Sequence, residues 1–431
     1  MLATGLLSSS QAAGIRTLTL DQTLAIAAVS NRGVARALEY RNLTEGRYVE
    51  ERAAALPHFT LSGSLIRQDD DALDNPTLDR RDARVGLNQA LFTWGELQAG
   101  IRAARIGLQT ADEQLRFSRQ AALRDAALAF YDVLLARELN HVVAQNLEQK
   151  SRRLAEAQRR NAVGVATDYD VLVAEVAEAN ARPEVLRTAN LITSRRDRLR
   201  LILGLDEPVD VVGELAAPLA DPPGYAEAFA KARDRRPDLR DLDYRIGIAE
   251  ELVTIASAGD KPRLDLTGST GWRELETEEY RRDGQSWDVG LYLSWPLFDG
   301  LKARGQVQQA RSQRDALRID ARQLLDTVSL ETREAIDQLR VAAELVRALD
   351  GTVAQAERLL ALSEKGFEYG VKIRLEVDDA ELNLRQARTS LAIARRDYLA
   401  AATELAWAMG VLGEQALPGL PVPAVTDPTL H

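Results

Sequence analysis

The sequence predicts a mainly α-helical protein with a small β part, built from two copies of one structural unit. Three observations lead to this fold class: residues that recur at a fixed spacing, apolar seams that run through many helical turns, and short segments in which apolar and polar residues alternate. Each copy is predicted to contain a helix, a pair of strands, a very long helix, a turn and a further long helix.

The recurring residues are separated by 206 positions. Gly204 matches Gly410 and Gly164 matches Gly370, since 410 − 204 and 370 − 164 both equal 206. The same spacing relates Leu91-Phe92 to Leu297-Phe298, Gly164-Val165 to Gly370-Val371, and Ala174-Glu175 to Ala380-Glu381. A spacing of 205 relates Pro57, Leu61, Gly63 and Ser64 to Pro262, Leu266, Gly268 and Ser269. Such a register indicates duplication.

The first repeat is predicted over residues 18–222 and the second over 223–413. The spacing leaves open whether the halves are two domains or two interlocked parts of one body. Residues 1–17 are interpreted as a disordered start or the remnant of a signal peptide, because small residues surround Ala12-Ala13. Residues 414–431 form a C-terminal tail.

Composition excludes several classes of function. The net charge of −10 and a pI near 5.2 argue against nucleic acid as a partner, because nucleic-acid-binding faces are basic. Cysteine is absent, which excludes disulfides, a thiol nucleophile and a thiolate metal site. With three His and two Met, we expect no metal site and no cofactor. No stretch approaches 18 consecutive apolar residues, so no transmembrane helix is predicted.

The longest helix is predicted over about residues 300–367. Apolar or small residues recur there at alternating spacings of four and three: Val328, Thr332, Ala335, Leu339, Ala342, Val346, Leu349, Val353, Ala356, Leu360, Ser363 and Phe367. This heptad seam is typical of helices packed side by side in a left-handed supercoil. A helix of roughly 65 residues is about 100 Å long at 1.5 Å per residue.

The other long helices repeat this pattern. The first copy has a seam over about 96–160, formed by Ala122, Ala126, Ala129, Val133, Ala136, Val143, Leu147, Leu154 and Ala157 and interrupted by Asn140 and Lys150. The helices after the turns are predicted over about 167–203 and 373–410. The latter has the seam Ala380, Leu384, Ala387, Leu391, Ala394, Tyr398, Ala401, Leu405 and Ala408. Pro183 predicts a kink in the former.

Four strands are predicted, at about 57–67, 83–93, 262–273 and 286–298. In the last of them Trp287, Val289, Leu291, Leu293, Trp295 and Leu297 alternate with polar or small residues, which indicates a sheet with one apolar face. Trp287 and Trp295 are about 26 Å apart at 3.3 Å per residue. Together with Trp272 they resemble the aromatic girdle around the apolar band of a membrane barrel.

The loops within the strand pairs, 68–82 and 274–285, are predicted to be long and exposed. A soluble sandwich with Trp side chains in its core also fits one such strand taken alone. Four strands cannot close a barrel, and open sheet edges are not tolerated in lipid. The membrane interpretation therefore requires an oligomer.

The turns between the long helices form two tips. Gly164 and Gly370 stand where a helix end favours a left-handed residue, and Thr167 or Asp168 is a candidate N-cap for the next helix. Capping accounts less well for three acids that lie deeper in their helices, Asp170, Glu376 and Asp379. No Ser/His/Asp set, zinc motif, phosphate-binding loop or dinucleotide motif is present, so the chain is not expected to be an enzyme.

The chain resembles the TolC-like outer-membrane efflux protein family from about Leu18 to Gly413. The resemblance rests on the two glycine tips and on three further motifs: Leu91-Phe92-Thr-Trp-Gly, Trp295-Pro-Leu-Phe298-Asp-Gly and Arg236-Pro237-Asp238-Leu239. It implies a homotrimer in the outer membrane of a Gram-negative bacterium, extending into the periplasm. Each protomer would contribute four strands to a twelve-stranded barrel in contact with outer-membrane lipid, and its helices would form a periplasmic tunnel. Residues 205–222 and the tail would form a belt around this tunnel.

The function implied is that of a passive export duct in a tripartite efflux or type I secretion system, opened at its tips by a periplasmic adaptor (membrane fusion) protein and an inner-membrane pump. The resemblance places Glu376 and Asp379 in acidic rings that constrict the pore, Lys372 at a gate-holding position and Asp170 in the closed-state network. The adaptor would dock on the tip turns, at Gly164, Val165, Thr167, Gly370 and Val371.

Two residues depart from the family pattern. Lys372 cannot offer the bidentate fork of arginine, and Phe367 stands where some members have a hydrogen-bonding tyrosine. The closed state is therefore expected to be held differently here. The alternative function is a soluble, elongated coiled-coil scaffold or adaptor with a small β domain, because heptads alone are more typical of such proteins.

Overall fold

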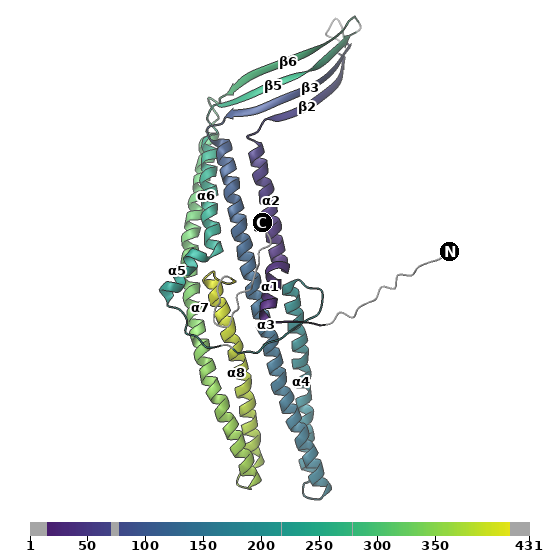
Figure 1. The fold of residues 1–431 in the computed structure, drawn as a ribbon, viewed down its shortest axis with the longest axis vertical. Coiled ribbons are helices and arrows are strands. Elements are labelled where there is room, and N and C mark those ends of the chain that lie inside the picture. Colours follow the sequence, from purple (N-terminus) through teal and green to yellow (C-terminus); the bar gives the residue numbers. More distant parts are fainter. Residues whose placement is uncertain (1–14, 70–76, 217, 278, 414–431) are drawn as a thin grey trace, which may run out of the picture. The chain divides into compact units, whose positions relative to one another are not determined.

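The computed structural model describes residues 15–69, 77–216, 218–277 and 279–413 (Figure 1). Its helices are α1 (Leu20–Ser30), α2 (Arg32–Ala53), α3 (Glu96–Ala162), α4 (Asp168–Leu203), α5 (Tyr225–Arg235), α6 (Pro237–Ser257), α7 (Lys302–Glu368) and α8 (Arg374–Ala408). Its strands are β1 (Arg16–Leu18), β2 (His58–Asp69), β3 (Thr77–Phe92), β4 (Val209–Val211), β5 (Arg263–Thr277) and β6 (Arg281–Ser294). The tail and most of the predicted start lie outside the described residues.

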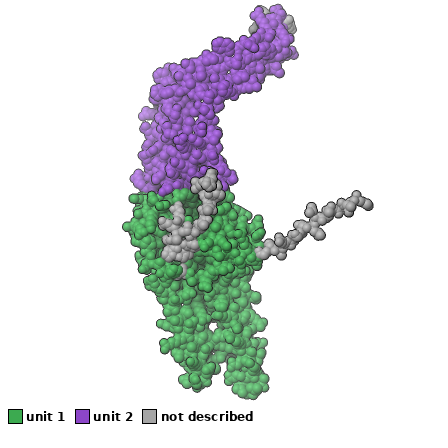
Figure 2. Space-filling view, in the orientation of Figure 1, with its two compact units in different colours: residues 1–37, 115–237, 325–431 green, residues 38–114, 238–324 purple. Residues whose placement is uncertain are grey.

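The chain divides into two compact units, shown in Figure 2. Unit 1 comprises residues 1–37, 115–237 and 325–431, and unit 2 comprises residues 38–114 and 238–324. Each unit takes segments from both sequence repeats, so the repeats interlock and neither forms a compact unit alone. Helices α3 and α7, of 67 residues each, both contribute to both units. Across the described ranges, no helix is long and apolar enough to cross a membrane.

Unit 2 contains a four-stranded sheet with the order β2-β3-β5-β6, in which every neighbouring pair is antiparallel. Successive side chains of a strand point to opposite faces of such a sheet. The register therefore gathers the apolar residues on one face: Phe59, Leu61, Leu65, Val85, Leu87, Leu264, Leu266, Trp272, Trp287, Val289, Leu291 and Leu293. Small and polar residues make up most of the other face, which also carries Ile66, Leu78 and Leu275 near one end.

The strands are longer, and the turns between them shorter, than the sequence predicted. β2 continues to Asp69 and β3 begins at Thr77, while β5 and β6 are joined by three residues, 278–280. The added segments carry charges on both faces, so the alternation that reveals a strand is lost while the backbone pairing continues. Cross-strand ion pairs such as Arg67 to Asp79, with 2.7 Å between Nε and Oδ1, hold these segments together.

The apolar face forms a band of defined length along the strands. On β5 it extends from Leu264 to Trp272, which is about 26 Å at 3.3 Å per residue. Most of its members are exposed, with 81% for Leu61 and 78% for Trp287, while Leu87, Leu264 and Leu266 are half-buried. Trp272 lies at one end of the band, and Trp287 pairs with Thr270, two residues from Trp272 toward the middle of the band. Trp295 directly follows Ser294, the last residue of β6. A contiguous apolar surface of this size marks contact with lipid or another protein.

Unit 1 has its core where α1, α3, α4, α7 and α8 meet. Burial confirms the predicted heptad seams. Every seam residue of α8 is buried, and those of α7 are buried or partly buried. Asn140, which interrupts the α3 seam, donates a hydrogen bond from Nδ2 to Thr188 Oγ1 of α4 at 2.8 Å.

Helix α4 continues past Pro183, where the sequence predicted a kink. The parallel pair of β1 and β4 was not predicted.

Candidate functional site at the helix tips of unit 1

Both helix tips close with the same backbone motif. Gly164 has φ 74° and Gly370 has φ 70°, the left-handed conformation that the sequence predicted for both. At the first tip the Val165 N–H donates to the Arg160 carbonyl at 2.8 Å. At the second tip the Val371 N–H donates to the Gly366 carbonyl, also at 2.8 Å. These bonds are those of a Schellman motif, which satisfies the last carbonyls of α3 and α7.

Two of the predicted gate acids cap the helices that follow the tips. The Asp170 carboxylate accepts hydrogen bonds from Thr167, from its N–H at 2.9 Å and its hydroxyl at 2.8 Å. The Glu376 carboxylate accepts from the Ile373 N–H at 3.0 Å and lies 3.5 Å from Lys372 Nζ. Both acids are the third residue of their helix, so the expectation that they lie too deep for capping is wrong.

The other two predicted gate residues differ from each other. Asp379 is exposed and forms no hydrogen bond or ion pair with any residue the structure describes. Lys372 is partly buried, and its Nζ also lies 3.5 Å from Ser363 Oγ. Its stem covers Gly366, where a Cβ would lie 2.9 Å from Lys372 Cγ. Within one protomer Lys372 therefore joins the two helices of the second tip, and Asp379 remains free.

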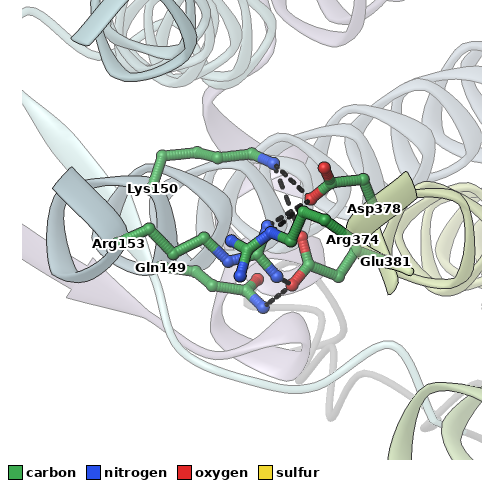
Figure 3. A network of polar contacts seen from close by, with 6 residues as sticks. All are labelled: Gln149, Lys150, Arg153, Arg374, Asp378 and Glu381. Carbon is green, nitrogen blue, oxygen red and sulfur yellow. Dashed lines mark hydrogen bonds and ion pairs between the residues drawn. The ribbon is translucent and has the colours of Figure 1, made fainter. Parts of the chain in front are cut away.

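A network of charges joins the two helix hairpins near the tips (Figure 3). Its six members come from two helices: Gln149, Lys150 and Arg153 of α3, and Arg374, Asp378 and Glu381 of α8. Arg153 donates to Asp378 Oδ1 at 2.6 Å and also pairs with Glu381. Lys150 Nζ lies 3.4 Å from Glu381 Oε2.

The centre of the network is withdrawn from water, while Arg374 and Asp378 lie at its exposed edge. The side chains of Arg153 and Glu381 are 15% and 6% exposed. Burial, reinforced by the neighbouring Arg153, lowers the pKa of Lys150. Burial also lowers the pKa of Arg153, which remains charged because arginine titrates far above neutrality. Three cations meet two carboxylates here, so the removal of one partner leaves a poorly hydrated charge.

A cavity of about 440 Å³ lies beside this network, between the tips of the two hairpins. Its lining mixes charge with exposed apolar side chains, including Val165, Tyr169 and Phe367. The Arg374 guanidinium lies 5.6 Å from the centre of the Phe367 ring, a cation–π contact. Some members of the resembled family have a hydrogen-bonding tyrosine at this position. Here Phe367 contacts Arg374 through its ring instead.

Sequence reasoning missed Arg153, Asp378 and Glu381 as interacting residues. Their contacts join positions more than 220 apart in the chain, which periodicity within one helix cannot reveal. Two signals were available. Lys150 interrupts the seam of α3, and Glu381 belongs to the duplicated Ala-Glu dipeptide. A charge that breaks a seam indicates a partner on the facing helix.

The cap of α4 should persist in acid. The Thr167 N–H and hydroxyl hold the pKa of Asp170 below its usual range. A carboxyl whose folded pKa is lowered stabilises the fold above its unfolded pKa, and this contribution is lost as the pH falls through the lowered value. We expect amide-exchange protection of Asp170 and Val171 to hold down to a pH below about 4. Asp170→Asn should remove this pH dependence; loss of protection already at pH 5 to 6 in the parent would contradict the assignment.

Comparisons with known proteins agree with this architecture. The sequence profile of the outer membrane efflux protein family matches residues 24–205 and 229–411. The outer membrane protein TolC of Vibrio cholerae is 25% identical over 374 residues, which are 84% of this chain and 84% of that protein. The alkaline protease secretion protein AprF of Pseudomonas aeruginosa is 26% identical, over 85% of this chain and 79% of the relative. A crystal structure of a membrane protein from Pseudomonas aeruginosa has a TM-score of 0.79 at 22% identity, covering 92% of this chain and 91% of that one.

The two matched segments correspond to the two sequence repeats and together span most of the chain. This match decides against the alternative of a soluble coiled-coil scaffold and confirms the resemblance seen in the sequence. Proteins of this family are outer-membrane channels of efflux and secretion, not enzymes. The chain belongs to the outer membrane efflux protein family.

Proposed function

We propose that three copies of this chain close one twelve-stranded barrel in the outer membrane and form a passive export duct that ends at the helix tips. The observation that carries the proposal is the two-faced sheet of unit 2. Its apolar band runs about 26 Å along the strands, which at the tilt of about 40° usual for outer-membrane barrels is about 20 Å of height, near the apolar band of about 25 Å in such barrels. A soluble domain would hide such a face in its core, whereas here Leu61, Leu291 and Trp287 are more than half exposed.

The edges of the sheet support closure between copies. β2 and β6 are the two edge strands, and each has one unpaired side. Unpaired backbone groups are not tolerated in lipid, so both edges must find partners. The alternating strand directions make β6 of one copy antiparallel to β2 of the next. Two copies would give eight strands, whose interior is filled by side chains, whereas three leave room for a channel.

Disulfide crosslinking tests this closure directly, because the chain has no cysteine of its own. Thr60→Cys on β2 would be combined in turn with Ser286→Cys, Asp288→Cys or Tyr292→Cys on β6. We expect at least one pair to give a closed covalent trimer on non-reducing gels of outer-membrane fractions. Thr60→Cys alone is the control and should remain monomeric after denaturation. A ladder of open-ended multimers, or no crosslink for any pair, would refute a three-copy barrel.

The tips supply the gate in this proposal. The α3–α8 network holds the two hairpins of each protomer together, and an adaptor that binds the tips would bias this contact. Apolar side chains are exposed there for such a partner, with 66% for Val165 and 82% for Val371. The inner-membrane pump would supply the energy, and this chain would supply the path.

Block of the channel by a cation should distinguish the roles of the two acids of the second tip, Glu376 and Asp379. Asp379 is free within its protomer, whereas Glu376 already caps a helix and faces Lys372. We expect Asp379→Asn to weaken block of the channel by a trivalent cation about tenfold in planar bilayers, because three such carboxylates would ring the pore. Glu376→Gln, the matched control, should change block by less than about threefold. Equal effects, or none for Asp379→Asn, would remove Asp379 from the constriction.

A further inference from the structure

The polar face of the sheet in unit 2 carries its positive charge in one place. A row is here a set of residues paired across β2, β3, β5 and β6. Three consecutive rows, toward the ends of the strands that are joined by the β5–β6 turn, hold four arginines and one aspartate. In strand order these rows are Ser62, Arg84, Gly271, Ser286; Ser64, Asp82, Arg273, Gly284; and Ile66, Arg80, Leu275, Arg282.

The single aspartate neutralises only part of this charge. Arg80 Nε donates to Asp82 at 3.2 Å, and the Ser64 hydroxyl donates to the same carboxylate at 2.7 Å. The Arg282 guanidinium lies 5.4 Å from the centre of the Tyr280 ring. A cation–π contact fixes the position of a guanidinium without cancelling its charge.

Two of the four arginines are only weakly compensated, because the one carboxylate near them, Asp82, is already bound by Arg80 and Ser64. Arg84 and Arg273 form no ion pair within the described part of the chain, and Arg273 Nε is buried without a hydrogen-bond partner there. The sheet leaves space for Arg84 at Gly271, where a Cβ would lie 2.7 Å from Arg84 Cγ and 2.3 Å from the Ala83 carbonyl oxygen. Glycine is thus the residue that lets this side chain lie across the sheet.

The rest of the polar face is close to neutral. Nearer the helices, Arg263 Nε donates to Asp265 at 3.1 Å, so these two charges cancel. Asp288 accepts a hydrogen bond from the Ser269 hydroxyl at 2.6 Å. The excess of positive charge is therefore confined to the three rows.

The opposite face provides a contrast at the same height. Arg67 pairs with Asp79 at 2.7 Å, and Arg81 lies 3.3 Å from Glu274 and 3.5 Å from Glu276. Each guanidinium on that face meets a carboxylate, as expected for a charged border directly beyond an apolar band. Pairing is thus available in this part of the sheet, and on the polar face only Arg80 makes use of it, with Asp82.

We propose that Arg80, Arg84, Arg273 and Arg282 form an anion-attracting collar inside the barrel, which favours cargo that carries carboxylate, phosphate or sulfonate groups. The inference rests on the proposed function, because closure of the barrel with its apolar face toward lipid turns the polar face inward. Three copies then place twelve arginines, three times four, around one opening against three aspartates. Guanidinium groups bind planar oxyanions through paired N–H donors.

The collar has the opposite sign to the free Asp379 carboxylates at the tips. Fixed charges that line a narrow aqueous path concentrate ions of opposite sign and repel those of like sign. The two sets of fixed charge therefore act in opposite ways on an anionic solute, which the carboxylates repel and the collar attracts.

Ion selectivity of the reconstituted trimer tests the collar. The parent would be compared in planar bilayers, under a potassium chloride gradient, with the variant Arg80→Gln, Arg84→Gln, Arg273→Gln, Arg282→Gln. We expect the potassium-to-chloride permeability ratio to rise at least about threefold in the variant. Tripolyphosphate, added on each side in turn, should block the parent and lose about tenfold in apparent affinity for the variant.

The matched control is Arg67→Gln with Arg281→Gln, which removes two arginines from the lipid-facing side of the same sheet. Its permeability ratio should stay within about 1.5-fold of the parent. The single variant Arg84→Gln, which retains three arginines, should shift the ratio part of the way. No shift in the fourfold variant, or an equal shift in the control, overturns the collar. Failure of the parent to conduct at all would instead refute the proposed channel.

Discussion

Replacing Arg153 with methionine should loosen the contact between α3 and α8 by about 3 kcal/mol, the largest effect that we expect from a single change in unit 1. Arg153 bridges Asp378 and Glu381, and the Glu381 side chain is only 6% exposed. In the variant the Glu381 carboxylate would keep its contacts with Gln149 and Lys150 but lose Arg153, its principal cation. Breaking a buried pair from one side costs more than the pair contributes, because the remaining charge stays poorly hydrated.

The expected readout is local opening. Peptides of α3 and α8 that contain the network should exchange amide hydrogen about 100-fold faster in Arg153→Met than in the parent, which corresponds to about 3 kcal/mol. In bilayers the same variant should show more frequent spontaneous opening, because the two hairpins are less firmly joined.

The matched control is the double variant Arg153→Met, Glu381→Leu. Replacing both members of a buried ion pair by apolar residues of similar size is often close to neutral, so exchange and opening should return toward the parent. If Arg153→Met leaves exchange unchanged, the network does not hold the hairpins. If the double variant is as loose as the single one, Arg153 acts through something other than its charge.

The helical part of the fold was predictable because its determinants are local. A seam with spacings of four and three is visible in any window of α7 or α8, and its residues are buried in α8 and buried or partly buried in α7. Caps are equally local. Gly164 and Gly370 predict left-handed turns, and Thr167 predicts the start of α4. For the same reason the capping roles of Asp170 and Glu376 could have been predicted from the third position of each helix.

What escaped prediction depends on pairs that are distant in sequence. The contact of Arg153 with Glu381 depends on how one hairpin lies against the other, and no single-helix pattern encodes that. The interlocking of the repeats is a similar case, because a constant spacing reports duplication but not which segments pack together. Strand ends were misplaced because paired charges on both faces, such as Arg67 with Asp79, hide the alternation.

Phe59→Arg should prevent assembly of the protein in the outer membrane, whereas Thr60→Arg should permit it. The two residues are adjacent on β2 and point to opposite faces of the sheet. Phe59 is 71% exposed and pairs with Leu87, which pairs with Gly268, midway between the ends of the apolar band at Leu264 and Trp272. An arginine at the bilayer midplane of a barrel costs about 2–4 kcal/mol, and three copies incur this cost together.

The measurement is the amount of heat-sensitive trimer in outer-membrane fractions, which we expect to fall at least about tenfold for Phe59→Arg and to stay near the parental amount for Thr60→Arg. Phe59→Leu, which keeps the site apolar, should assemble like the parent and so separates polarity from the loss of the ring. A soluble scaffold would give no trimer in outer-membrane fractions, either for the parent or for the variants. Equal assembly of Phe59→Arg and Thr60→Arg would show that the two faces of the sheet meet the same environment, and the lipid-facing assignment of the apolar band would then be wrong.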